Sequence, residues 1–76
     1  MELTKGEFCQ FNLNTRIALL REFGKNVLKR RDRKKMISVY EVFGFYVEVY
    51  ENLANRKLEK CEPLKTELVQ VYRELL

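Results

Sequence analysis

The sequence predicts an α+β domain in two layers, with the order helix, three antiparallel strands and helix. Apolar residues recur every three or four positions near both ends of the chain, as in amphipathic helices. Between these ends, residues 36–51 are mostly valine, isoleucine, phenylalanine and tyrosine, which favour strands. A chain of 76 residues is expected to form a single domain, 1–76. The predicted architecture is a three-stranded antiparallel sheet packed by an N-terminal and a C-terminal helix.

A capping box near the N-terminus predicts the first helical turn. At the spacing of Thr4 and Glu7, the threonine hydroxyl accepts from the glutamate amide while the glutamate carboxylate reaches back. A short turn from Phe8 to Phe11 is expected to follow, although Gly6 weakens it.

The clearest helix is predicted over residues 13–30, with Asn12 or Asn14 as its N-cap. Its apolar stripe consists of Ile17, Leu20, Phe23, Gly24, Val27 and Leu28. A glycine lowers helix stability. The place of Gly24 on the stripe therefore indicates that another group packs close to its backbone.

Residues 36–51 are interpreted as a tight hairpin with strands at 37–42 and 45–51 and a turn at Phe43-Gly44. This register gives one mostly apolar face, formed by Ser38, Tyr40, Val42, Phe45, Val47 and Val49. The opposite face holds Ile37, Val39, Glu41, Tyr46, Glu48 and Tyr50. Because Phe43 is a poor residue for the positive φ of such turns, a longer loop or one bent strand from 36 to 51 stays open.

The rest of the chain supplies a reversal, an edge strand and a helix. Asn52–Arg56 is expected to form the reversal, because asparagine tolerates left-handed backbone. A third strand over Lys57–Pro63 carries four charges, as edge strands often do, and Pro63 ends it. Thr66 then caps a helix over Glu67–Leu76, which is too short to be stable without docking on the sheet.

Two stretches of the chain, NTRIALLREFG (14–24) and FYVEVY (45–50), resemble a group of small uncharacterised bacterial proteins. Proteins of this group have about the same length and the order helix, three strands, helix. The shared motifs are structural, so the resemblance implies no activity, cofactor or catalytic residue. It does imply that the chain forms a homodimer.

Several classes of functional site are disfavoured by composition. The chain has no histidine, which removes the commonest general base and any Ser-His or Cys-His nucleophile pair. Its three glycines form no phosphate-binding loop. Cys9 and Cys61 are expected to be partly buried free thiols, with a disulfide or a zinc site as the lesser alternatives. Glu41 and Glu48 share a predicted sheet face and are interpreted as solvated charges. We therefore expect no enzyme, no cofactor, no metal and no small-molecule ligand.

No apolar run approaches the roughly 20 residues that a membrane-spanning helix needs. The first ten residues, MELTKGEFCQ, lack the basic start and apolar core of a signal peptide. The expected compartment is therefore the cytoplasm, with no membrane partner.

Positive charge is concentrated in Lys29–Lys35, which holds six basic residues and one acid, a net charge of +5. The rest of the chain holds nine basic and ten acidic residues. The six cations are Lys29, Arg30, Arg31, Arg33, Lys34 and Lys35. This basic run is predicted to follow a helix C-terminus, where cations favour the macrodipole, and to cross a loop. Three interpretations stay open: a solvated loop, a site for nucleic-acid phosphates, or a contact with an acidic protein or membrane surface.

The tyrosines carry the remaining alternatives. Tyr46 and Tyr50 are predicted on one side of a strand, where ordinary packing, a subunit interface and nucleobase stacking are each possible. The candidate interface consists of Tyr46, Tyr50, Tyr72, Leu75 and Leu76. The leading hypothesis is a non-catalytic protein-interaction domain that forms a homodimer, because the predicted helices cover only one face of the sheet. The alternative is a nucleic-acid-associated accessory protein that uses residues 29–35.

Overall fold

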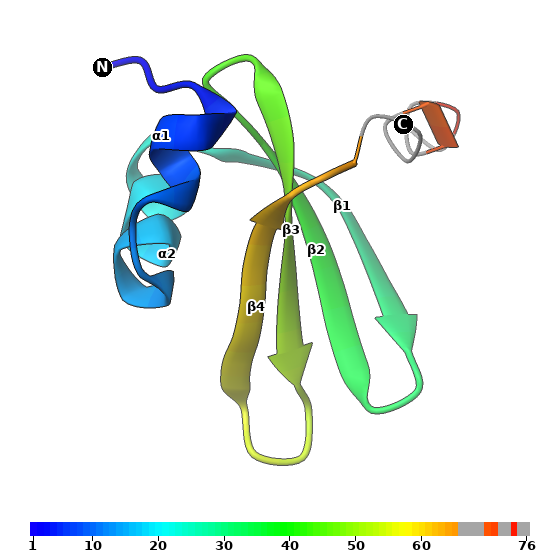
Figure 1. Ribbon diagram of the computed structural model, residues 1–76. Coiled ribbons are helices and arrows are strands. Elements are labelled where there is room, and N and C mark those ends of the chain that lie inside the picture. Colours follow the sequence, from blue (N-terminus) through cyan, green and yellow to red (C-terminus); the bar gives the residue numbers. More distant parts are fainter. Residues whose placement is uncertain (66–69, 72–73, 75–76) are drawn as a thin grey trace.

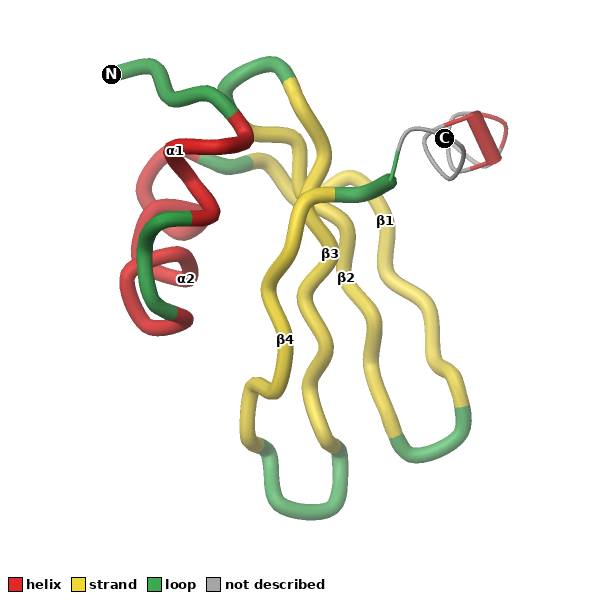
Figure 2. The backbone as a smooth tube through the Cα atoms, in the orientation of Figure 1, coloured by secondary structure: helices red, strands yellow, loops and turns green. Residues whose placement is uncertain are grey.

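The computed structural model describes residues 1–65, 70, 71 and 74. Its elements are α1 (Lys5–Cys9), α2 (Leu13–Phe23), β1 (Lys25–Asp32), β2 (Lys35–Val42), β3 (Phe45–Asn52) and β4 (Lys57–Pro63). The strands form one antiparallel sheet in the order β1-β2-β3-β4. Both helices lie on the same face of this sheet (Figure 1, Figure 2). The α+β class is therefore confirmed, with one strand more than predicted.

The predicted C-terminal helix over Glu67–Leu76 lies largely outside the described residues. Within it, Gln70, Val71 and Glu74 have helical backbone and exposed side chains. Three of the predicted interface residues, Tyr72, Leu75 and Leu76, are also outside the described residues.

The capping box predicted at the N-terminus is confirmed. The amide of Glu7 donates to Thr4 Oγ1 at 3.1 Å, and the amide of Thr4 donates to Glu7 Oε1 at 2.9 Å. The helix that follows begins at Lys5 and so starts earlier than the predicted turn. Its central aromatic, Phe8, is fully buried and packs edge to face on Phe45 at 5.8 Å between ring centroids.

The helix predicted over residues 13–30 is wrong in its second half. It begins after Asn12, as expected, but ends at Phe23. Gly24 stops it: the Gly24 amide donates to the Leu20 carbonyl at 2.9 Å, and a Cβ on Gly24 would lie 2.7 Å from that same oxygen. A group does lie close to Gly24, and it is the Leu20 carbonyl of the same helix, four residues earlier.

A β-bulge explains why β1 resembles a helix in sequence. The pairing of β1 with β2 shifts between Asn26 and Leu28. As a result, both Val27 and Leu28 pack against the cluster of Val39 and Leu64. Two adjacent apolar residues directed to one side are typical of a helix stripe, and a regular strand would not show them.

The predicted β2–β3 hairpin is confirmed in its register. Val42 pairs with Phe45, and the pairing continues without a shift to Lys35 and Asn52. The two turn residues, Phe43 and Gly44, have φ values of 50° and 83°. The Phe43 ring lies 5.5 Å from the ring of Phe23 and 6.3 Å from the ring of Phe45, between centroids. These contacts compensate for the left-handed backbone that phenylalanine otherwise disfavours.

The two sheet faces have separate apolar clusters, as the alternation predicted. The helix-covered face buries Phe8, Leu20, Val42, Phe45, Val47, Val49 and Cys61. The other face buries Val39 and Leu64, with Val27, Leu28 and Tyr46 partly buried against them. The predicted edge strand over Lys57–Pro63 is confirmed as β4, and β1 forms the second edge.

One cation joins the helices to the sheet. The Arg16 guanidinium donates to the carbonyls of Cys9 at 2.6 Å, Phe11 at 2.8 Å and Cys61 at 2.7 Å. Its Cζ also lies 5.7 Å from the centroid of the Phe8 ring. Because Cys61 is on β4 while Cys9 and Phe11 flank the link between the helices, Arg16 fixes the helical layer against the edge strand.

We predict that Arg16→Met lowers the free energy of unfolding by about 3 kcal/mol, because hydrogen bonds from a charged donor contribute roughly 1.5–3 kcal/mol each. Urea denaturation followed by circular dichroism measures the loss. The control is Arg21→Met on the same helix, since Arg21 is exposed and has no hydrogen bond or ion pair with a described residue. The role of Arg16 is contradicted if the two variants lose the same stability.

Candidate nucleic-acid interface

The basic run forms the β1–β2 hairpin, which corrects the prediction of a helix end and a loop. Residues 29–32 lie on β1, Arg33 and Lys34 form the turn, and Lys35 begins β2. Arg33 has a φ of 59°. In Figure 1 this turn lies at the end of the sheet far from α1. No helix ends at these residues, so the macrodipole does not account for their charge.

The pleat of the sheet divides the cations of β1 between two faces. Lys29 pairs with Ser38, Arg30 with Ile37 and Arg31 with Met36. Because successive strand residues point to opposite faces, Lys29 and Arg31 lie on the helix-covered face, and Arg30 lies on the other. The basic run therefore makes no single row of charge, and its members differ in their surroundings.

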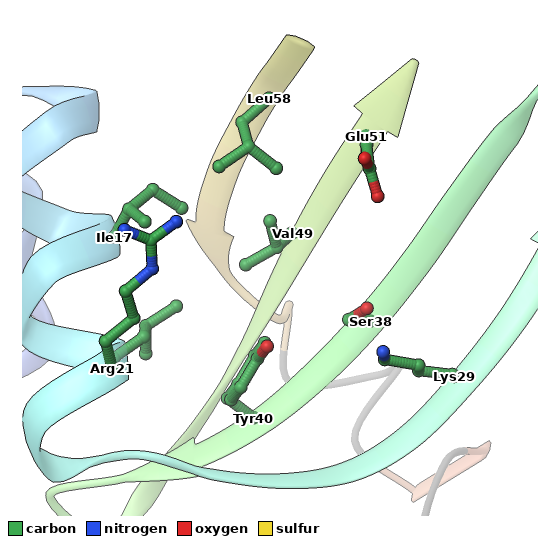
Figure 3. A pocket seen from close by; sticks show the side chains of 9 residues that line it. Ile17, Arg21, Lys29, Ser38, Tyr40, Val49, Glu51 and Leu58 are labelled. Atoms are coloured by element: carbon green, nitrogen blue, oxygen red, sulfur yellow. The ribbon is translucent and has the colours of Figure 1, made fainter. Parts of the chain in front are cut away.

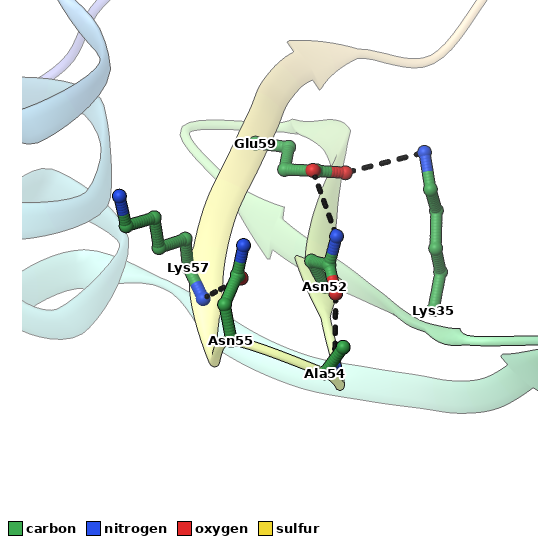
Figure 4. Close-up of polar contacts among 6 residues, drawn as sticks. All are labelled: Lys35, Asn52, Ala54, Asn55, Lys57 and Glu59. Atoms are coloured by element: carbon green, nitrogen blue, oxygen red, sulfur yellow. Dashed lines mark hydrogen bonds and ion pairs between the residues drawn. The ribbon is translucent and has the colours of Figure 1, made fainter.

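Two of the six cations are paired with carboxylates. Arg30 Nη2 lies 4.0 Å from Glu48 Oε2, and Lys35 Nζ lies 3.2 Å from Glu59 Oε1. Glu59 also accepts a hydrogen bond from Asn52 Nδ2 at 3.2 Å (Figure 4). The hydrogen bonds from Asn52 and Lys35 hold the pKa of Glu59 below its usual value. Glu59 therefore stays ionised and balances the charge of Lys35.

The other four cations, Lys29, Arg31, Arg33 and Lys34, form no ion pair within the part of the chain that the structure describes. Arg31 Nε donates to the Arg33 carbonyl at 3.1 Å, which holds that side chain along the turn. Arg31, Arg33 and Lys34 thus surround the turn with unneutralised charge, all of it exposed.

The β3–β4 loop lies beside this turn. The amide of Leu53 donates to the carbonyl of Lys34 at 2.8 Å, which links the two hairpin ends. The loop holds its shape through two asparagines whose Oδ1 atoms accept from backbone amides: Asn52 from Ala54 and Asn55 from Lys57, each at 2.9 Å (Figure 4).

The predicted reversal at Asn52–Arg56 is therefore confirmed, but for a different reason than expected. Neither asparagine is left-handed; Arg56 is, with a φ of 61°. The asparagines act through their side chains, as in Asx turns. The loop thereby places Arg56 and Lys57 at the same end of the sheet as the basic hairpin, where both line a hollow beside α2.

We call these two linked hairpin ends the basic end, comprising Lys29–Lys35, Glu51, Arg56, Lys57 and Glu59. It carries eight basic and three acidic side chains, a net charge of +5, whereas the rest of the chain totals −1. A hollow of about 560 Å³ lies on it, lined by Asp32, Arg33, Lys34, Lys35 and Tyr50. The structure thus brings the whole excess of positive charge to one end of a rigid sheet.

The tyrosines singled out in the sequence have different surroundings. Tyr46 is half-buried against Val39 and Leu64. Tyr50 is half-buried in the hollow of the basic end, with Lys60 Nζ 5.2 Å from its ring centroid. They share the face that lacks α1 and α2, as predicted, but only Tyr50 meets the basic run. The homodimer interface stays a prediction.

Glu48 corrects the interpretation of Glu41 and Glu48 as solvated charges. Glu41 is exposed, but Glu48 is only 8% exposed and lies near Arg30.

Residues 1–65 with 70, 71 and 74 contain no group of three His, Cys, Asp or Glu side chains suited to a metal ion. In the same residues no helix has the length and apolarity to cross a membrane.

Both cysteines are free thiols, as predicted, but they differ in exposure. Cys9 is exposed, whereas Cys61 is 1% exposed within the core under the helices. Burial raises the pKa of the Cys61 thiol to about 11. Cys61 is therefore protonated at neutral pH and is not available as a nucleophile.

Comparison of this chain with protein-family models, with curated proteins and with solved structures found no match. The resemblance to a group of small bacterial proteins stays a prediction, and the geometry above carries the functional inference.

We predict that a disulfide reagent modifies Cys9 rapidly and Cys61 only when the core opens.

The free energy of unfolding should also depend on pH. Since burial raises the pKa of Cys61 from 9.0 to about 11, the unfolded chain loses this proton before the folded chain does. The contribution of the Cys61 thiol to the free energy of unfolding is therefore complete below pH 9 and declines between pH 9 and 11.

The measurement uses Cys9→Ala, so that Cys61 is the only thiol, and compares its modification rate with that in urea. Cys61→Ala is the control for the pH dependence, because it should remove the decline assigned to the thiol. Equal modification rates in buffer and urea would show that Cys61 is accessible.

Proposed function

We propose that this chain is a small non-catalytic domain whose basic end binds the phosphate backbone of nucleic acid. The observation that carries the proposal is the set of exposed cations at the β1–β2 turn, Arg31, Arg33 and Lys34, which no described carboxylate neutralises. Lys57, at the start of β4, adds a further exposed cation without an ion pair among the described residues. Such a cluster releases condensed counterions when it meets phosphates, which favours binding.

The shape of the basic end supports this choice of partner. A two-stranded antiparallel ribbon is narrow enough to enter the major groove of a duplex, and here the cations surround the tip of such a ribbon. The hydrogen bond from Leu53 to the Lys34 carbonyl supports the turn from the side. The cations therefore project from a turn that a neighbouring loop holds in place. Binding then costs less conformational entropy than it would if the same cations lay on a mobile loop.

Binding of this kind is expected to be largely independent of sequence. Lysine and arginine contacts to phosphates position a protein on nucleic acid but do not read bases. Tyr50, which lines the hollow on the basic end, is half-buried and shares its surroundings with Lys60. We therefore assign the basic end to backbone contact and give base stacking no part in it.

We predict that labelled duplex DNA binds with log affinity falling against log salt at a slope near −4, from about four to five phosphate contacts. The triple variant Arg31→Gln, Arg33→Gln, Lys34→Gln removes about three contacts, so its slope should fall to about −1. Fluorescence anisotropy at several salt concentrations measures both slopes. Glutamine keeps an unbranched stem, so the backbone strain at Arg33 is unchanged.

A matched control has the same change in net charge at three exposed lysines outside the basic end: Lys5→Gln, Lys25→Gln, Lys65→Gln. This variant should bind as the unmodified chain does. Equal losses in both variants would show that net charge alone is responsible, and flat titrations at low salt would overturn the proposal. Polyglutamate binding as tightly as DNA with the same salt slope would assign the basic end to an acidic protein instead.

A further inference from the structure

A second site lies between α2 and the sheet. A cavity of about 140 Å³ opens there, with walls from α2 and all four strands (Figure 3). Its origin is a difference in length. The 11 residues of α2 span about 16 Å. The eight residues of β2 or β3 span about 26 Å, so α2 leaves part of the face uncovered.

One side of the cavity is apolar. Ile17 of α2 faces Val49 of β3 and Leu58 of β4, and Leu20 of α2 also belongs to the lining. An enclosed apolar cavity of about 150 Å³ holds a benzene molecule, which sets the scale for the body that this cavity accommodates. The volume therefore fits a compact ring or branched chain, and excludes a nucleotide or a lipid.

The other side is polar and lacks partners. Ser38 is only 9% exposed, and its side chain lies on the cavity wall. Neither its hydroxyl nor that of Tyr40 hydrogen-bonds to any residue in the described part of the chain. Both hydroxyls are reached by solvent, since the described residues hold no fully buried side-chain oxygen or nitrogen without a hydrogen-bond partner. These two groups are therefore available to hydrogen-bond with a molecule that occupies the cavity.

Two cations complete the lining. Lys29 on β1 extends its ammonium group toward Ser38, and Arg21 approaches from α2 (Figure 3). Neither forms an ion pair with a described residue. The acid of the lining, Glu51, has its Oε2 3.5 Å from Arg56 Nη1 and is thereby neutralised. The cavity is left with a net positive charge beside an apolar floor.

We propose that this cavity binds a small monocarboxylate with a compact apolar body, such as an aromatic or branched acid. The carboxylate accepts from the Ser38 hydroxyl and the Lys29 ammonium group, and the body packs against Leu20 and Val49. This inference does not depend on the nucleic-acid proposal, because the cavity uses Lys29 and none of the three residues at the turn. It revises the expectation that the chain has no small-molecule ligand.

The test is a titration of the ¹⁵N-labelled full chain with benzoate, followed by amide chemical shifts. We expect saturable shifts at Ser38, Tyr40 and Val49. Benzyl alcohol keeps the ring without the charge, and acetate keeps the charge without the ring. Each should bind about tenfold more weakly than benzoate, because benzyl alcohol lacks the carboxylate and acetate lacks the ring.

Variants separate the cavity from general charge effects. Lys29→Gln should weaken benzoate binding about tenfold, whereas Lys25→Gln, the same change at the other end of β1, should leave it unchanged. The triple variant at Arg31, Arg33 and Lys34 should also bind benzoate normally. Ser38→Ala should weaken binding, and Lys29→Gln, at an exposed position, still tests the site if Ser38→Ala does not fold.

Three results would overturn the proposal. Benzyl alcohol binding as tightly as benzoate would show that no carboxylate is recognised. Equal effects of Lys29→Gln and Lys25→Gln would reduce the effect to net charge. The absence of saturable shifts at the cavity residues at millimolar benzoate would show that the cavity holds water only, which polar cavities of this size accommodate.

Discussion

The Arg16 guanidinium is the interaction on which the arrangement of the layers depends. The helices have only 5 and 11 residues, too few to be stable in isolation, so they need a fixed place on the sheet. Arg16 provides it by binding carbonyls of Cys9, Phe11 and Cys61 at once. With the helices held in this way, Phe8 enters the core against Phe45, and α2 forms one wall of the cavity.

Strand β1 links the two proposed sites. Its bulge near Val27 lets the strand bury Val27 and Leu28 before it continues into the basic run. The pleat then directs neighbouring cations to different surroundings: Lys29 to the helix-covered face, where it lines the cavity, and Arg30 to the other face, where it lies near Glu48. A helix over the same residues would have presented them to solvent at the end of a flexible connection. Placing them on a strand gives each cation a fixed direction and a distinct set of neighbours.

The cations of the basic end fall into two groups, those held in ion pairs and those without an ion pair among the described residues. Lys35 of β2 pairs with Glu59 of β4, which also accepts from Asn52 of β3, and Arg56 of the β3–β4 loop pairs with Glu51 of β3. Exposed ion pairs of this kind contribute little to stability, at most about 1 kcal/mol each, so their effect is mainly to set geometry. The cations at the turn have no such partners among the described residues. The two groups differ because Glu51 and Glu59 lie on either side of the β3–β4 loop and form no ion pair with the cations of the β1–β2 turn.

The sequence by itself determined the features that depend on neighbouring residues. The capping box, the register of the β2–β3 hairpin, its two faces and the edge strand β4 were all predicted, because alternation and turn chemistry act over a few positions. The tertiary structure alone decided that residues 25–32 form a strand, since a bulge and a helix stripe give the same local spacing. It also decided the role of Arg16 and the existence of the cavity. Arg16 and the Cys61 carbonyl are 45 residues apart in the sequence, and the cavity is lined by residues of α2 and of the strands. These groups meet only because of how α2 lies over the sheet, and no local sequence pattern records that packing.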